Sequence, residues 1–70
     1  MLREGQVWRN GRTVVQVKDH QGFYELAEFD LLSGDGLKFR TRKNFSDEQS
    51  ALNFLSGMKC EATDNRIMAL

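Results

Sequence analysis

The spacing of apolar residues changes once along this chain, near Ser46, and that change constrains the fold more than any other feature. Before it, apolar side chains recur mainly at alternate positions, which is the period of a strand with one buried face. After it they follow the period of an α-helix. The pattern predicts an α+β fold, an antiparallel sheet of three or four strands in a meander with one helix packed on one face.

The first two strands are predicted from the dipeptide Asn10-Gly11. It is the strongest short signal for a β-hairpin, because both central residues of a type I′ turn need positive φ. A two-residue loop at this dipeptide gives the following pairs: Arg9 with Arg12, Trp8 with Thr13, Val7 with Val14, and Gln6 with Val15. One hairpin face then carries Trp8, Thr13, Val15 and Val17, and the other carries Val7, Val14, Arg9 and Arg12.

The third predicted strand, 23–32, follows a turn at 19–22 and has two apolar phases. Phe29 and Leu31 share one parity, whereas Tyr24 and Leu26 share the other. Either both faces of this strand are partly covered, or a β-bulge near Ala27 re-aims the side chains. We favour the bulge.

The fourth predicted strand, 37–43, follows a turn at 33–36 and directs Leu37, Phe39 and Thr41 inward. Its outer face carries a basic stripe, Lys38, Arg40 and Arg42, as a phosphate-binding groove would require. A five-residue loop, however, places Asp30 opposite Lys38 and Glu28 opposite Arg40. We therefore favour a ladder of salt bridges, which leaves Arg42 and Lys43 as candidate contacts for nucleic acid.

The helix is predicted over 47–56. Ser46 is a good N-cap, and Gln49 completes a capping box three residues later. Gly57 is a natural residue to end the helix in the left-handed conformation. The expected core comprises Trp8, Val15, Val17, Phe29, Phe39, Leu52 and Leu55.

Two questions about the architecture stay open at this point. A curled five-strand barrel with the helix as a plug is the main alternative to the open sheet. The segment 66–70 fits either a final edge strand or a short helical turn, and we favour the strand.

Length and composition limit what else the chain contains. Seventy residues, starting at Met1, predict one domain, 1–70, and a complete small gene product. Ten basic residues balance ten acidic ones, which argues against a general nucleic-acid binder. One cysteine, Cys60, and one histidine, His20, are too few for a disulfide or a structural zinc site, and a lone thiol suits a reducing cytoplasm. No signal peptide or membrane span is expected.

No catalytic, metal or cofactor site is expected. Asp47 and Glu48 are explained by helix capping, and the acidic residues of 23–32 by the salt-bridge ladder. His20 lies in a turn without a partner that the sequence identifies. Trp8 and Tyr24 belong to the core more naturally than to a base-stacking surface.

The candidate site is the hairpin face with Arg9 and Arg12, because like charges opposite one another are destabilising. Val7 and Val14 share this face, and Arg3 lies at its far end. Arginine beside an apolar centre is typical of the anchor of a protein interface. The alternative is that the helix or the tail covers this face, with Asp64 or Glu61 as counter-charge.

One resemblance adds to this interpretation. A strand followed by "FSDEQ" and a short "ALNFL" helix, over residues 35 to 58, is similar to small phage-encoded inhibitors, including some anti-CRISPR proteins. The resemblance implies a protein without enzymatic activity that occludes a surface of a host complex, often one that handles nucleic acid. It assigns no role to any single residue.

The sequence therefore predicts a small cytoplasmic protein that binds a protein partner. The alternative is a β-rich domain that binds nucleic acid through a local basic patch, Arg3, Arg9, Arg12, Arg42 and Lys43. A homodimer formed through an exposed strand edge is a further option, since no proline protects the outer strands.

Overall fold

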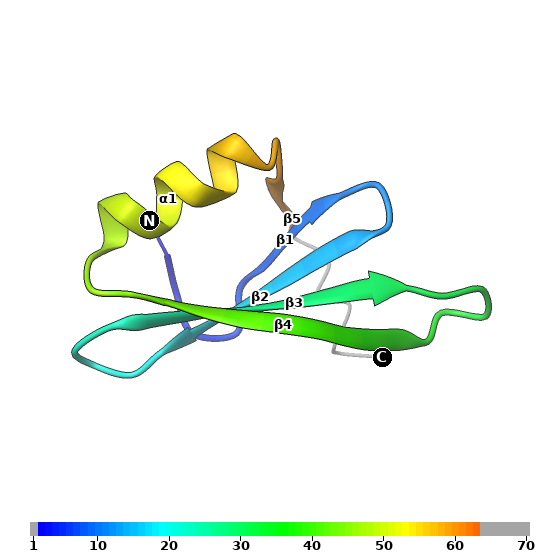
Figure 1. Cartoon of the computed structure of the whole chain (residues 1–70), viewed down its shortest axis with the longest axis horizontal. Coiled ribbons are helices and arrows are strands. Elements are labelled where there is room, and N and C mark those ends of the chain that lie inside the picture. Colours follow the sequence, from blue (N-terminus) through cyan, green and yellow to red (C-terminus); the bar gives the residue numbers. More distant parts are fainter. Residues whose placement is uncertain (1, 64–70) are drawn as a thin grey trace.

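The computed structural model describes residues 2–63, which form an open five-stranded sheet and one helix (Figure 1). The elements are β1 (Val7–Asn10), β2 (Thr13–Asp19), β3 (Tyr24–Leu31), β4 (Leu37–Phe45), α1 (Glu48–Gly57) and β5 (Glu61–Thr63). The strand order is β4-β3-β2-β1-β5, and all neighbours are antiparallel. The predicted α+β class is confirmed, with β5 as an additional edge strand. The strand expected over 66–70 lies outside the described residues.

The sheet is open rather than a barrel, because β4 and β5 lie at its two edges and do not pair. The helix packs on one face, which we call the helix face, and the opposite side is the far face. The fully buried centre of the helix face combines Val15, Val17, Leu26, Ala51 and Leu55. Trp8 and Leu52 pack against this cluster, as predicted.

The register of the first hairpin differs from the prediction by two residues. Asn10 pairs with Thr13, and the turn consists of Gly11 and Arg12. Gly11 has φ +60°, and glycine at the first central position is typical of a type II′ turn. Because the shift is even, every side chain keeps the face assigned to it, but Arg9 lies opposite Val14 instead of Arg12.

The helix begins one residue later than predicted. Asp47, not Ser46, is the N-cap, and its Oδ1 accepts a hydrogen bond from the Ser50 amide at 2.8 Å. This hydrogen bonding lowers the pKa of Asp47. The left-handed residue after the helix is Lys59, with φ +59°, rather than Gly57.

A β-bulge separates the two halves of the β3–β4 hairpin. Glu28 pairs with Thr41 but Phe29 pairs with Phe39, so Arg40 is an extra residue in β4. The bulge lies close to the predicted position, but on the neighbouring strand, so β3 keeps its alternation throughout. Phe29 and Phe39 therefore lie on the far face, and their prediction as core residues is wrong.

Candidate functional site

The predicted anchor of the hairpin is not accessible. Val7 and Val14 each expose 1% of their surface. They lie on the far face as expected, but a buried valine cannot fill a depression on a partner. The prediction that they form an exposed apolar centre is therefore wrong.

The two arginines of this hairpin are exposed but do not oppose one another. Arg9 Nε donates to the carbonyl of Gly11 at 3.2 Å, and Arg9 lies in register with Glu61 of β5. Arg12 Nη1 donates to the carbonyl of Leu31 at 2.9 Å. Neither side chain forms an ion pair within residues 2–63. Arg12 is thus held against the end of β3 by a hydrogen bond to a carbonyl. Its guanidinium charge is not neutralised by a carboxylate within residues 2–63.

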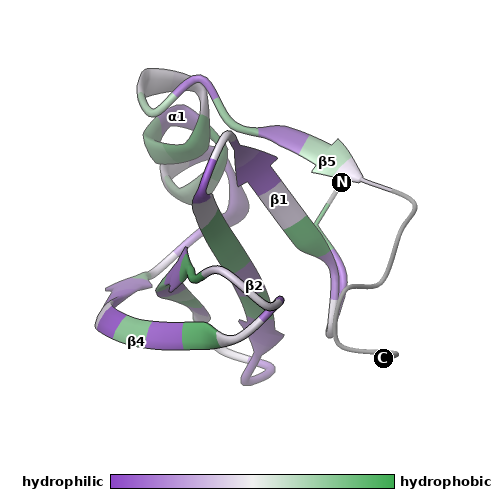
Figure 2. Cartoon of the chain, turned by 90° about the vertical axis from the view of Figure 1, so that its right-hand side faces the viewer, coloured by the Kyte–Doolittle hydropathy of each residue, from purple (hydrophilic) through white to green (hydrophobic). Residues whose placement is uncertain are grey.

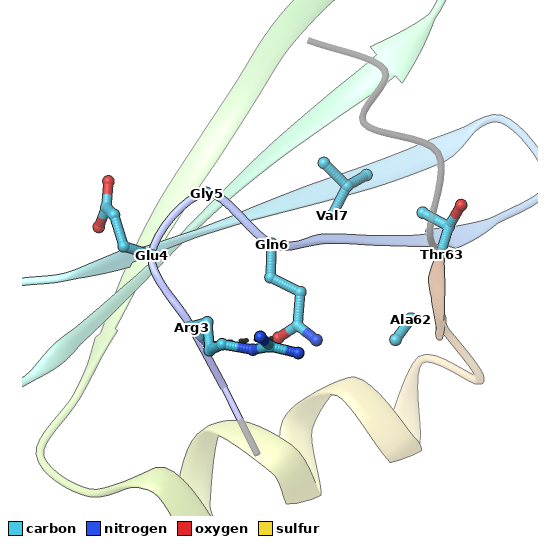
Figure 3. Close-up of a pocket in the computed structure, with 7 residues that line it drawn as sticks. All are labelled: Arg3, Glu4, Gly5, Gln6, Val7, Ala62 and Thr63. Atoms are coloured by element: carbon cyan, nitrogen blue, oxygen red, sulfur yellow. Dashed lines mark hydrogen bonds between the residues drawn. The ribbon is translucent and has the colours of Figure 1, made fainter. Parts of the chain in front are cut away.

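Arg3 lies far from this pair. It precedes β1 at the end opposite the β1–β2 turn, beside Gln6 (Figure 3). A polar pocket of about 240 Å³ opens there between the N-terminal segment and β5. The pocket is lined by Arg3, Glu4, Gly5, Gln6, Val7, Ala62 and Thr63. The structure does not bring Arg3 together with Arg9 and Arg12, so the three arginines do not form one site.

A different apolar surface lies at the outer end of the β3–β4 hairpin. We call it the far-face patch: Phe29, Leu31, Leu37 and Phe39. The register pairs Phe29 with Phe39 and Leu31 with Leu37, and the two aromatic rings meet edge to face with centroids 5.8 Å apart. Phe39 is 47% exposed, the most exposed large apolar side chain among the described residues.

Two arginines flank the far-face patch. The guanidinium of Arg42 lies 5.1 Å from the centroid of the Phe39 ring, within the range of a cation–π interaction. Its Nε is 3.6 Å from Oε2 of Glu25. On the other side, Arg12 reaches the carbonyl of Leu31. The patch is therefore apolar at its centre and positive at two borders. The backbone register places all four residues of the patch on the same face.

Arg42 and Lys43, predicted together as contacts for nucleic acid, point to opposite faces. Lys43 Nζ lies 3.2 Å from Oε2 of Glu28 and 5.1 Å from the centroid of the Phe54 ring of α1. Glu28 is 3% exposed, whereas the Lys43 side chain is 47% exposed and contacts α1 through the Phe54 ring. Lys43 thus serves the packing of α1 and leaves Arg42 alone on the far face.

The predicted salt-bridge ladder is present in a modified form. Asp30 lies opposite Lys38, as expected, but Arg40 is the residue that forms an ion pair with Asp30. Arg40 also lies 4.0 Å from Glu28. The bulge causes this change, because it turns Arg40 toward the helix face beside both carboxylates.

The other reactive side chains of the described region do not assemble into a catalytic or metal site. Burial, and then the charge of Glu28, raise the pKa of the Cys60 thiol, which opposes formation of the nucleophilic thiolate. Among residues 2–63, no group of three or more His, Cys, Asp and Glu side chains is arranged to hold a metal ion. In the same region, no helix has the length and apolarity needed to cross a membrane.

The far-face patch escaped sequence reasoning, although a signal for it was present. The two apolar phases of 23–32 are real, because Leu26 is buried on the helix face while Phe29 lies on the far face. Of the two alternatives for this segment, partial covering of both faces is the one that holds, because the bulge lies in β4 and not near Ala27. Along β4, hydrophobic and hydrophilic residues alternate, as expected for a strand with one apolar face (Figure 2).

Comparisons of this chain with protein-family models, curated proteins and solved structures found no match.

Proposed function

We propose that the chain is a binding protein without enzymatic activity that occludes a surface of a partner protein through the far-face patch. One observation carries the proposal. The half-exposed ring of Phe39, with the Arg42 guanidinium over it, is held on two paired strands on the side opposite the helix.

The composition of this surface supports protein binding. Aromatic residues and arginine are enriched in the energetically dominant part of protein interfaces, and exposed apolar clusters rimmed by charge mark such sites. The far-face patch combines two phenylalanines and two leucines with Arg12 and Arg42 at its borders. Because these side chains stand on paired strands, little backbone entropy is lost on binding.

The expected partner surface follows from this arrangement. It has an apolar depression that receives Phe39 and carboxylates that meet Arg12 and Arg42. Overall neutrality of the chain fits a protein partner better than nucleic acid, because recognition then depends on local rather than net charge. The specific form of this proposal is an inhibitor of a host complex in the cytoplasm. Its basis is the resemblance of residues 35 to 58 to small phage-encoded inhibitors.

Nucleic acid is the second candidate, because an exposed aromatic ring beside arginine also suits stacking of an unpaired base. Such binding would weaken steeply with salt. A nuclease treatment and a salt series therefore separate the two candidates.

The decisive experiment compares two exposed phenylalanines. Phe39 is 47% exposed on the patch, and Phe23 is 39% exposed in the turn between β2 and β3, stacked on His20. Affinity purification from nuclease-treated host lysate is carried out with the wild type, Phe39→Ala and Phe23→Ala. We expect the partner to be retained by the wild type and Phe23→Ala but lost from Phe39→Ala. Equal recovery by the two variants would refute the role of the patch.

A further inference from the structure

The outer edge of β4 adjoins the far-face patch, because Leu37 and Phe39 belong to this strand. We infer that this edge accepts an extended acidic segment of the partner protein, which adds to the sheet as a further strand. This inference rests on the proposed function and goes beyond it, because it specifies the conformation and charge of the bound segment. Addition of a strand to a sheet edge is an established mode of peptide recognition.

The edge is long and unpaired among the described strands. Within residues 2–63, β4 (Leu37–Phe45) pairs with β3 alone, whereas the opposite edge, β5, spans only Glu61–Thr63. Residues of an edge strand alternate between those whose backbone groups face the neighbour and those whose groups face outward. In the part of the chain that the structure describes, β4 therefore offers outward N–H and C=O groups that pair with no other strand.

The hydrogen bonds of β3 identify the outward-facing residues. The Leu31 amide donates to the carbonyl of Arg12, so the backbone of Leu31 faces β2. By alternation, Phe29 and Ala27 also face β2, while Asp30 and Glu28 face β4. Their partners Lys38 and Thr41 consequently face β3.

The residues between and beyond these partners present their backbone groups to the outside. They are Leu37, Phe39, Arg42 and Asn44. Phe39 and Arg42 are also the cation–π pair of the far face. An added strand would therefore form backbone hydrogen bonds to the same residues whose side chains border the patch, so one segment would contact both the edge and the patch.

The charge of β4 selects an acidic segment. The strand contains four basic residues, Lys38, Arg40, Arg42 and Lys43, and no acidic one. Glu28 and Asp30 engage Lys43 and Arg40, but Lys38 forms no ion pair in the part of the chain that the structure describes. The side chain of Arg42 is 64% exposed despite its contact with Glu25. Positive charge therefore remains along the edge.

The same charge opposes pairing of two copies of this chain. Two β4 strands side by side would place lysine and arginine against lysine and arginine, and like charges across strands are destabilising. The edge is thus suited to a partner of opposite charge rather than to a homodimer.

The inference is tested with a short peptide in which glutamate and valine alternate, titrated into the isotopically labelled chain. We expect the amide resonances of Phe39, Arg42 and Asn44 to shift and their hydrogen exchange to slow. A matched peptide with lysine in place of glutamate should leave them unchanged. Sedimentation should show a monomer throughout.

The control for the backbone contact is Asn44→Pro compared with Asn44→Ala. Proline removes one outward N–H, is tolerated on an edge strand and changes no charge. The loss of one hydrogen bond should weaken peptide binding about threefold to tenfold in Asn44→Pro relative to Asn44→Ala. The amide spectrum of each variant reports whether the fold is retained. If Asn44→Pro unfolds, the exchange rates of the wild-type amides decide the question.

Several outcomes would overturn the inference and leave the proposed function intact. They are absence of binding by the acidic peptide, equal binding by the lysine peptide, shifts confined to side chains of the far face, and formation of a homodimer through β4. The proposed function fails separately, if the partner is recovered equally by Phe39→Ala and Phe23→Ala.

Discussion

The two faces of the sheet use apolar residues for different purposes. On the helix face, Val15, Val17 and Leu26 are completely buried under α1. At the outer end of the far face, Phe39 is 47% exposed and its neighbours are only partly covered. The difference is not one of composition, because both surfaces are built from large apolar side chains on the same strands. It is local, because Val7 and Val14 on the same far face are buried as well, and only the outer end of the β3–β4 hairpin remains exposed.

The comparison also concerns charge. The helix face buries Glu28, which is held by Lys43 and Arg40, so its charges are satisfied within the chain. The far face presents Arg42 and Arg12, whose side chains remain exposed despite their contacts with Glu25 and the carbonyl of Leu31. The contrast is one of degree, because Arg42 has an ion pair with Glu25 on the far face and Lys38 on the helix face forms none within residues 2–63.

The largest expected effect is that of Leu55→Ala on the helix face. Leu55 is fully buried, and removing such a side chain costs about 2–5 kcal/mol. In a domain of this size the midpoint of thermal unfolding should fall by about 10 °C or more. The matched control is Leu32→Ala, because Leu32 is 45% exposed and its loss should change the free energy of unfolding by less than about 0.5 kcal/mol. Similar effects in both variants would contradict the assignment of the core.

Glu28→Gln should have the next largest effect. It removes a buried charge that two cations neutralise, but the Lys43 and Arg40 side chains are 47% and 48% exposed and can regain water. We therefore expect a loss of about 1–2 kcal/mol, less than for a fully buried pair. Asp30→Asn should lower the free energy of unfolding by less than Glu28→Gln does, because Asp30 is the more exposed carboxylate partner of Arg40. Urea unfolding of the two variants measures which loss is larger. The reverse order would argue against a structural role of Glu28.

Phe39→Ala should cost less stability than either core change. It removes one edge-to-face contact and one cation–π contact, together about 1 kcal/mol. Urea unfolding should therefore give a midpoint moderately below that of the wild type, but well above that of Leu55→Ala, for a variant that has lost its partner. A loss of stability as large as that of Leu55→Ala would place Phe39 in the core and abolish the contrast between the two faces.

The smallest effect is expected at Asp47, and it depends on pH. Hydrogen bonds from Ser50 lower the pKa of Asp47, so the folded state binds this proton less readily than the unfolded chain does. The stabilisation is present above the ordinary pKa of aspartate and is lost as pH falls through the lowered value. Asp47→Ala should thus be less stable than the wild type at neutral pH, and the difference should shrink in acid.

Urea unfolding at both pH values tests this prediction, with Asp47→Asn as the control, since asparagine also caps helices but does not titrate. A difference between Asp47→Ala and the wild type that is equally large in acid would show that the carboxylate charge plays no part.

The sequence predicts elements better than it predicts which surface remains exposed. The hairpins, the helix and the apolar phase of β2 follow from local rules of period, turn and capping, and they agree with the structure. The pairs across the first turn do not agree. A two-residue loop can consist of Asn10-Gly11 or of Gly11-Arg12, and the two choices give registers that differ by two residues and keep every side chain on the same face. The face on which Phe29 and Phe39 lie depends on whether β3 or β4 contains the bulge. The position of the bulge is set by the pairing between the two strands, which local sequence rules do not specify.

The extra residue at Arg40 has a consequence for how evolutionary relatives of this chain would look. It reverses the alternation within β4, so that Thr41 lies on the helix face and Phe39 on the far face, although their spacing is even. A relative that lacks this one residue would present the same surface with a straighter strand, yet its hydrophobic pattern would appear out of step with this one. Searches for such relatives should therefore allow a gap of a single position in the middle of the strand.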